Sequence, residues 1–135
     1  MKKISFEQFE KMMSYDVMKY MACIEVDFHV DDSLEYNSCC LGKTSYILGK
    51  KITQASYWYG LTPDGSQGYG YDSLYDFFTA PIFRGKSILE IWNSITFDAI
   101  DGCGVELRLP HYLGLEEQFI QGAASYDYRA SKQTK

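Results

Sequence analysis

The chain has 135 residues, of which 46% are hydrophobic and 16% aromatic, and its 18 acidic and 13 basic residues give a net charge of −5. That length fits one domain, and that hydrophobic share is ordinary for a protein with a folded core. The acidic balance argues against direct nucleic-acid binding, which needs a basic face, but it suits a basic patch on a protein partner. No stretch approaches the roughly 18 continuous apolar residues of a membrane-spanning helix.

The N-terminal stretch MKKISFEQFEKMM starts with basic residues but reaches Glu7 and Glu10 before an apolar run develops, so it is unlike a signal peptide. Without an export signal we expect a cytoplasmic protein whose four cysteines stay reduced. One domain is expected over residues 1–128, followed by a polar tail over residues 129–135.

The first predicted element is a helix near residues 5–14. Ser5 and Gln8 form an S-x-x-Q capping box at its start. Phe9 and Met13 follow at helical spacing, which gives the helix one apolar side.

A half-buried strand is predicted over residues 20–30, where apolar and polar side chains alternate. Its polar face carries Glu25, Asp27 and His29. A carboxylate–histidine group of this kind can act as a general base or hold a divalent cation, while a solvated strand face is the alternative. Residues 31–38 have the composition of a polar connection.

A second strand is predicted over residues 51–61, with Trp58 and Tyr57 on opposite faces. We expect it to pair as a hairpin with residues 44–48. The stretch TPDGSQGYG that follows, residues 62–70, has the composition of a turn or loop.

Two short helices are predicted next. Asp72 or Ser73 caps the first, and Pro81 ends it. Ser87 and Glu90 form a second capping box, which predicts a helix after residue 87.

The C-terminal third alternates again over residues 94–101, with Phe97 and Ala99 on one face, and residues 104–110 are predicted as a further strand. A last helix is predicted near residues 115–121. The total is an α+β domain with an antiparallel sheet of about four or five strands and three or four short helices.

Gly85-Lys86-Ser87 raises the question of a phosphate-binding loop. The G-x-x-x-x-G-K-[ST] motif needs glycine at position 80, which is Ala80 here. Capping by Ser87 and Glu90 explains the same residues, so we interpret them as the start of a helix.

Residues 71–102 carry an acidic and aromatic lead-in, then I-F-x-G-K-S, E-I-W and a strand ending in Ile-Asp-Gly. This pattern resembles one in small proteins of Gram-positive bacteria and their phages, a family with no assigned activity. The resemblance therefore implies no catalytic residue. It does imply a phage or mobile-element setting, in which small acidic single-domain proteins often inhibit host defence, as anti-CRISPR proteins do.

The four cysteines lack the C-x₂₋₄-C spacing of common zinc sites. A scattered zinc site built from Cys39, Cys40, Cys103 and His111 is one hypothesis. The other is that these residues are inert thiols, since free cysteine is often buried.

Cys103 lies between two glycines, eight residues before His111, and Asp98 or Asp101 is available to orient the histidine. A nucleophilic pair needs hydrogen-bond reach between thiol and imidazole. A Gly-x-Gly turn between two strands explains the spacing equally well, and we predict that the protein is not an enzyme.

Tyrosines gather in YWYGL and GYGYDSLYDFF, beside several glycines. Tyrosine supplies contact area at low entropic cost, and interfaces are enriched in it. The predicted partner-binding residues are Tyr57, Tyr59, Tyr69, Tyr71, Asp72 and Tyr75. The alternative is that about half of these rings belong to the core.

We therefore expect a non-enzymatic protein-binding module without a cofactor, monomeric or homodimeric. Its partner would be a CRISPR nuclease or another defence effector, blocked by occlusion. The alternative is a small cytosolic zinc- or ligand-binding protein.

Overall fold

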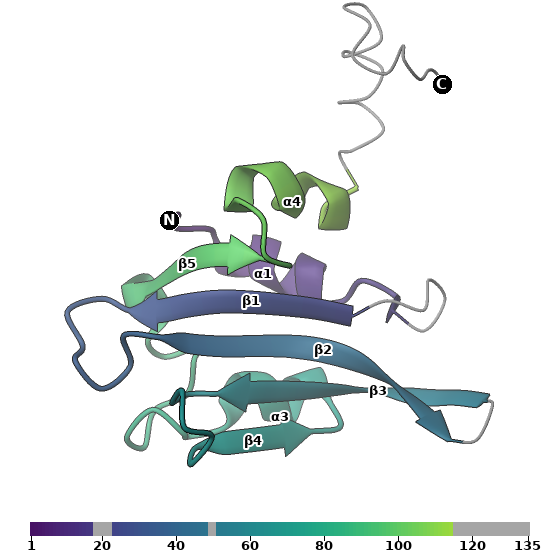
Figure 1. Ribbon diagram of the computed structural model, residues 1–135, viewed down its shortest axis with the longest axis horizontal. Helices are drawn as coiled ribbons and strands as arrows, with labels where there is room; N and C mark the ends of the chain where they lie inside the picture. Colours follow the sequence, from purple (N-terminus) through teal and green to yellow (C-terminus); the bar gives the residue numbers. More distant parts are fainter. Residues whose placement is uncertain (18–22, 49–50, 115–135) are drawn as a thin grey trace, which may run out of the picture.

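The computed structural model describes residues 1–17, 23–48 and 51–114. They form an antiparallel five-stranded sheet with strand order β4-β3-β2-β1-β5, together with short helices (Figure 1), so the α+β prediction is confirmed. The strands are β1 (Cys23–Val30), β2 (Cys39–Leu48), β3 (Lys51–Gly60), β4 (Gly68–Tyr71) and β5 (Ile95–Ile100). The helices are α1 (Phe6–Met13), α3 (Leu74–Thr79), the 3₁₀ turn η1 (Trp92–Ser94) and α4 (Val105–Tyr112).

Helix α1 begins as the sequence predicts. The Ser5 hydroxyl accepts a hydrogen bond from the Gln8 amide at 3.1 Å, and the Gln8 side chain accepts one from the Ser5 amide at 3.1 Å. These bonds satisfy two amides that the first helical turn leaves without partners. Phe9 and Met13 are fully buried, so the apolar side of α1 faces the sheet.

Strand β1 also follows its predicted alternation. Ile24, Val26 and Phe28 are fully buried, whereas Glu25 and Asp27 on the other face are exposed. β1 lies between β2 and β5, so the buried residues stand near the middle of the core.

The predicted hairpin is confirmed, because β2 pairs with β3 from Leu48↔Lys51 to Cys40↔Gly60. The prediction of a loop over residues 62–70 is wrong at its end. Residues 68–71 form strand β4 on the outside of β3. Its sequence, Gly-Tyr-Gly-Tyr, alternates, but the glycines mask the strand signal.

Helix α3 is capped by Ser73, whose hydroxyl accepts from the Asp76 amide at 3.1 Å. The second predicted capping box forms as well, since the Ser87 amide donates to Glu90 Oε1 at 2.8 Å. The chain after it, however, makes turns and then the 3₁₀ turn η1 instead of an α-helix. The Trp92 indole Nε1–H donates to the Ile4 carbonyl at 2.9 Å and ties this segment to the N-terminus.

The prediction for β5 needs one correction. Its pairing with β1 shifts register between Asp27 and Phe28, so Ile100 is fully buried and Ala99 is only partly buried. A bulge of this kind exchanges the two faces of a strand from that point on.

Residues 104–110 were predicted as a strand, and this is wrong. They form most of α4, whose buried residues Val105, Leu109 and Tyr112 recur at helical spacing. Val-Glu-Leu-Arg-Leu alternates over five residues and so fits either element. The helix predicted near residues 115–121 and the tail at 129–135 lie outside the described residues.

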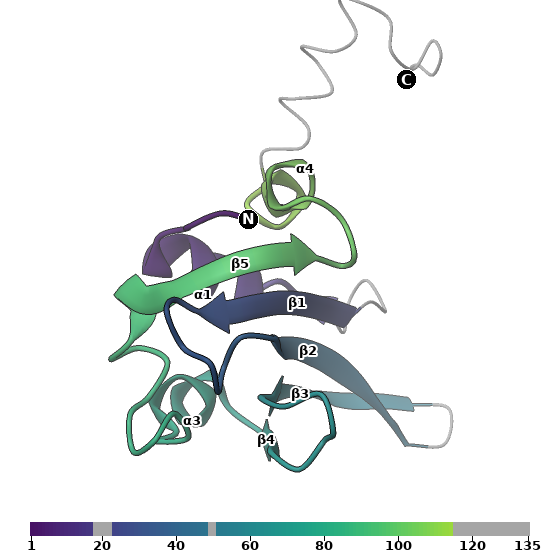
Figure 2. The same ribbon diagram turned by 60° about the vertical axis from the view of Figure 1, so that its left-hand side comes forward.

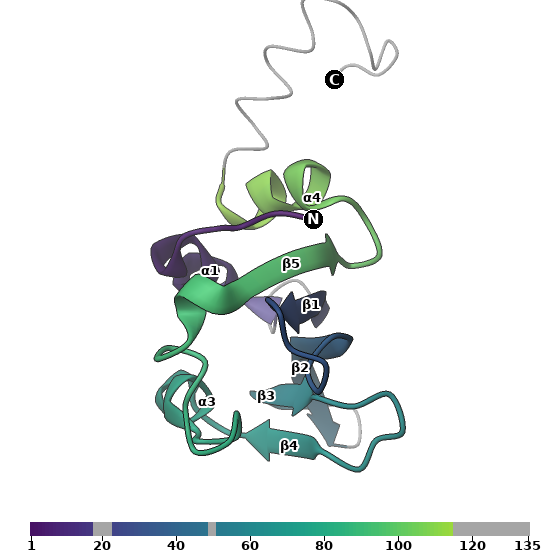
Figure 3. The ribbon, with the colours of Figure 1, turned by 90° about the vertical axis from the view of Figure 1, so that its left-hand side faces the viewer.

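Helices α1 and α3 lie on one side of the sheet (Figure 3), and α4 lies beyond its β5 edge (Figure 2). No helix of the described residues covers the opposite face, which is called the open face below. An antiparallel sheet with one covered face is stable in water because its strands alternate between apolar and polar side chains.

Candidate protein-binding site

The tyrosines that the sequence groups together are divided by the structure. Tyr59 is only 2% exposed, and its ring stacks on Phe77 with the ring centroids 4.2 Å apart. Its hydroxyl donates to the Phe77 carbonyl at 2.6 Å, and burial raises its pKa. The prediction that Tyr59 contacts a partner is therefore wrong, because β3 points this residue at the covered face.

Tyr57 and Tyr71 are half-buried. The Tyr57 ring lies 5.8 Å from that of Phe77, and Lys43 Nζ lies 5.4 Å from its centroid. Tyr71 meets the edge of Tyr59 at 6.2 Å. Both rings line the margin of the core, so each presents only part of its surface to solvent.

The remaining residues of the set are exposed. Tyr69 is 37% exposed on β4 and Tyr75 is 75% exposed on α3, with the exposed Asp72 between them in the chain. Together they border one edge of the sheet. These three residues and strand β4 are called the β4 edge below.

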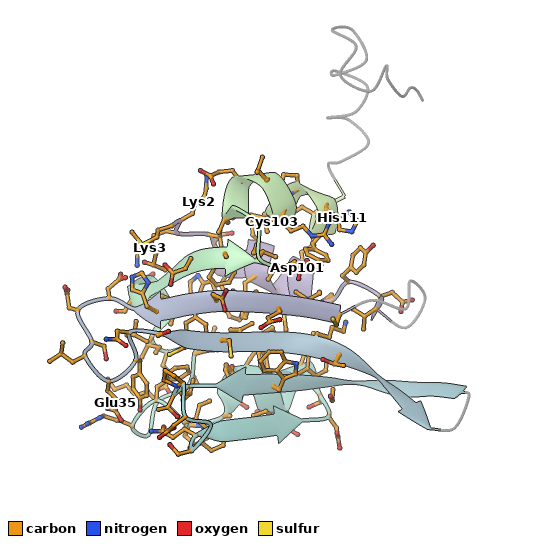
Figure 4. The ribbon with its side chains drawn as sticks, viewed as in Figure 1. Lys2, Lys3, Glu35, Asp101, Cys103 and His111 are labelled. Atoms are coloured by element: carbon orange, nitrogen blue, oxygen red, sulfur yellow. The ribbon has the colours of Figure 1, made fainter. Side chains whose placement is uncertain are left out.

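The two edges of the sheet differ. Along β5, Lys2 pairs with Phe97 through backbone hydrogen bonds of 2.7 and 2.9 Å, so the N-terminal segment covers part of that edge. Figure 4 shows Lys2 and Lys3 beside β5. Within the described ranges, β4 has no strand on its outer side. An exposed strand edge presents backbone donors and acceptors that can pair with another chain.

Trp58 is the functional candidate that sequence reasoning missed. It lies on the open face, outside the hydrophobic core, and its indole Nε1–H donates to Thr44 Oγ1 at 3.0 Å. Gly42 is its neighbour on β2. The alternation of residues 51–61 places Trp58 opposite Tyr57, but only the β2–β3 register shows that a glycine lies beside it.

Two acidic side chains lie on the same face as this tryptophan, and Glu25 is the nearer one. Glu25 pairs with Gly42, and Asp27 pairs with Cys40. Burial raises the pKa of the Cys40 thiol, and the charges of Glu25 and Asp27 add to that rise. Among the described residues, neither carboxylate forms a salt bridge.

His29 does not join Glu25 and Asp27. Its Nδ1 lies 3.0 Å from both carboxylate oxygens of Asp98, and its Nε2 lies 3.5 Å from Asp31 Oδ1. Hydrogen bonds from Lys3 and Thr96 lower the pKa of Asp31. This cluster joins the N-terminus, β1 and β5.

The structure does not assemble the hypothetical zinc site. Cys39 is buried on the covered face, whereas Cys40 lies on the open face, because successive strand residues point in opposite directions. Cys103 lies in the turn before α4 and His111 in the last turn of that helix. Over residues 1–17, 23–48 and 51–114, no group of three or more Cys, His, Asp or Glu side chains could hold a metal ion.

Cys103 and His111 do not form a nucleophilic pair either. Cys103 precedes α4 and His111 lies in its last turn (Figure 4). At 1.5 Å per residue, the step from Val105 to His111 alone spans about 9 Å along the helix axis, which is beyond hydrogen-bond reach. The Asp101 carboxylate forms three hydrogen bonds with other residues. It accepts from Arg108 Nε at 2.7 Å, from the Tyr112 hydroxyl and from the Glu25 amide at 3.0 Å. These bonds anchor α4 to β1.

The Gly-Lys-Ser stretch lies in a tight turn. Phe83 and Lys86 pair through backbone bonds of 2.9 and 3.2 Å, and Arg84 and Gly85 between them have φ values of 56° and 85°. Two successive left-handed residues are typical of a two-residue hairpin turn. The turn therefore explains Gly85 without a phosphate ligand.

Comparisons with known proteins add no relative: no family model matches the chain, and it matches no curated protein and no solved structure. In the described part of the chain, no helix has the length and apolar character needed to cross a membrane.

Proposed function

We propose that this protein is a non-enzymatic protein-binding module that uses the β4 edge as its contact surface. The observation that carries the proposal is the outer side of β4, where the described residues place no further strand, next to the exposed rings of Tyr69 and Tyr75. The opposite edge, by contrast, already pairs with Lys2.

The proposed binding mode is addition of a strand. An extended segment of the partner pairs with β4 through backbone hydrogen bonds, and flanking side chains supply specificity. Tyr69 and Tyr75 contribute amphipathic contact area, which interfaces favour. Asp72 lies between them in the chain and would accept a hydrogen bond or a cation from the partner.

Within this class, we propose an inhibitor of a host defence protein, such as a CRISPR nuclease, that acts in the bacterial cytoplasm by occlusion. The support is the resemblance of residues 71–102 to small proteins of Gram-positive bacteria and their phages. Those residues include Asp72, Tyr75 and helix α3. The segment that carries the resemblance therefore contributes residues to the proposed contact surface, the β4 edge.

The test is capture followed by measured binding. Tagged full-length protein is incubated with a lysate of a Gram-positive bacterium that carries an active CRISPR nuclease, and retained proteins are identified by mass spectrometry. A captured defence protein is then purified, and its affinity is measured for the wild type, Tyr69→Ala and Tyr75→Ala. Loss of affinity by about tenfold or more in these variants supports the proposal.

Leu107→Ala is the matched control, since Leu107 is 81% exposed on α4, away from β4. It should bind like the wild type. If the defence protein binds all three variants equally, the β4 edge is not the contact surface. If no defence protein is retained even at low salt, tight inhibition of the effectors in that lysate is ruled out.

A further inference from the structure

Trp58 is held in a fixed position on the open face. Its indole lies over Gly42, where an added Cβ would come within 2.4 Å of Cζ2 and 2.7 Å of Cε2. The indole N–H is already bonded to Thr44, so a ligand does not need to satisfy it. A ring ordered before binding costs less entropy when a partner contacts it.

The neighbouring strand leaves space beside this ring. Gly70 on β4 pairs with Trp58, and a Cβ added at Gly70 would meet nothing within 4 Å. The next row across the sheet is less open, because a Cβ added at Gly60 would lie 2.9 Å from Cys40 Sγ and one added at Gly68 would lie 3.9 Å from the Gly65 carbonyl oxygen. Among the described residues, the position of Gly70 therefore leaves room for a partner's side chain next to Trp58.

Negative charge lies on the other side of the ring. Glu25, Gly42 and Trp58 are consecutive partners across three strands. With neighbouring strands about 4.8 Å apart, the Glu25 and Trp58 Cα atoms are separated by about 10 Å, and the indole extends into that interval. Asp27 is two residues further along β1 and points the same way.

This combination discriminates between classes of partner. An apolar side chain that covered Trp58 would take water from the neighbouring Glu25 carboxylate without supplying a counter-ion, which is costly. An arginine fits both features, because its planar guanidinium stacks on an aromatic face and donates to carboxylates in a fixed fork. Lysine carries the charge but lacks the planar group.

We propose that the open face is a second docking surface, which binds an arginine-bearing segment of a protein partner. Trp58 is the platform for the guanidinium, and Glu25 and Asp27 supply the counter-charges. This surface uses the open face of the sheet and not the outer backbone side of β4, so it does not depend on the proposed function. The net charge of −5 attracts such a basic segment over longer distances.

The experiment uses the full-length protein and a defined probe, an acetylated hexapeptide of alternating arginine and glycine. The chain has two tryptophans, so an ¹H–¹⁵N spectrum contains two indole signals, assigned with Trp58→Phe. Trp92 is an internal reference, since its N–H donates to the Ile4 carbonyl. We expect the peptide to shift the Trp58 signal in a saturable way and to leave the Trp92 signal in place.

Two peptides of the same length control for charge and shape. The lysine peptide should bind more weakly, and the citrulline peptide, which keeps the planar group without the charge, should not shift Trp58. Glu25→Gln with Asp27→Asn should weaken the arginine peptide by about tenfold or more. Asp76→Asn with Glu106→Gln removes the same amount of charge from exposed positions on α3 and α4 and should have a much smaller effect.

Two results would overturn the inference. One is equal binding of the arginine and citrulline peptides, which would remove the role of charge. The other is an equal loss of affinity for the arginine peptide in both double variants. That result would show that only the net charge of the protein matters. Neither result bears on Tyr69 and Tyr75, so failure here leaves the proposal for the β4 edge intact.

Discussion

The indole of Trp58 occupies the space that a side chain at position 42 would need. A Cβ on Gly42 would lie 2.4 Å from the ring and 2.3 Å from the Ile24 carbonyl oxygen. The second contact is with backbone, so a rotation of the indole would relieve only the first. Gly42 therefore permits both the close packing of β1 against β2 and the position of the ring.

Gly42→Ala should lower the free energy of unfolding by about 1–3 kcal/mol, since overpacking forces backbone shifts. Gly70→Ala is the matched control, because the same methyl group meets nothing there within 4 Å. It should change stability by less than about 0.5 kcal/mol. Urea unfolding followed by circular dichroism measures both. Equal effects of the two substitutions would contradict the close contacts of Gly42 with both the Ile24 carbonyl and the Trp58 indole.

Asp101 and Tyr112 anchor α4, and a second prediction concerns them. Asp101→Asn keeps the left-handed turn at φ 53° accessible but removes the charge that Arg108 and Tyr112 contact. We expect a loss of about 1.5–3 kcal/mol, as for hydrogen bonds to charged groups. Tyr112→Phe should lose about 0.5–1.5 kcal/mol.

The double variant distinguishes this network from two independent effects. Because the residues share a bond, Asp101→Asn with Tyr112→Phe should lose less than the sum of the single changes. Leu107→Ala, at a position of α4 that is 81% exposed, is the control and should be close to neutral. Urea unfolding gives the four free energies. Strict additivity would contradict the shared bond.

The capping box at Ser5 and the alternation of β1 could be predicted because each depends on a short stretch of sequence. The helical structure of residues 105–112 could not be predicted in this way. Residues 105–109 alternate, while Val105, Leu109 and Tyr112 have helical spacing, and the packing of α4 against α1 and β5 selects the helix. Tertiary contacts decide such ambiguous segments.

The exposure of the side chains at the candidate site could likewise not be predicted from the sequence alone. The sequence places Tyr57 and Tyr59 on one face of a strand, but it does not say which face the helices cover. Tyr59 is therefore lost from the predicted contact set, whereas Tyr69 and Tyr75 remain exposed. Trp58 became a candidate only through the β2–β3 register, which depends on residues distant in the sequence.

Tyr59 yields a prediction about alkaline stability. Burial raises its pKa above the ordinary value of 10.0, so the unfolded chain releases this proton first. The stabilising contribution is thus complete below pH 10 and is lost as the pH rises beyond it. At pH 7, Tyr59→Phe should lose about 0.5–1.5 kcal/mol with the bond to Phe77, and between pH 9 and 11 its stability should fall less steeply.

Tyr75→Phe is the comparison for this series, because Tyr75 is 75% exposed on α3. Its pH profile of stability should follow that of the wild type. Urea unfolding at successive pH values gives the slopes. If Tyr59→Phe and the wild type lose stability in parallel above pH 10, Tyr59 ionises while the protein is folded.

The four cysteines should react with iodoacetamide in an order set by their positions. Cys23 and Cys103 are exposed and should be alkylated first at pH 8. Cys40 should follow slowly, because burial and its acidic neighbours raise its pKa. Burial raises the pKa of Cys39 to about 12, and its thiol donates to the Leu61 carbonyl, so it should react only after unfolding.

Peptide mass spectrometry over time separates the four rates, and urea-unfolded protein supplies the reference in which all four react. Glu25→Gln should accelerate Cys40 without changing Cys103, because a negative charge next to the thiol disfavours the thiolate. Native-state labelling of Cys39 as fast as that of Cys103 would contradict the placement of these adjacent cysteines on opposite faces. An unchanged rate at Cys40 in Glu25→Gln would mean that the Glu25 carboxylate does not influence the open face next to Trp58. The proposed role of Glu25 as a counter-charge for the arginine would then be contradicted as well.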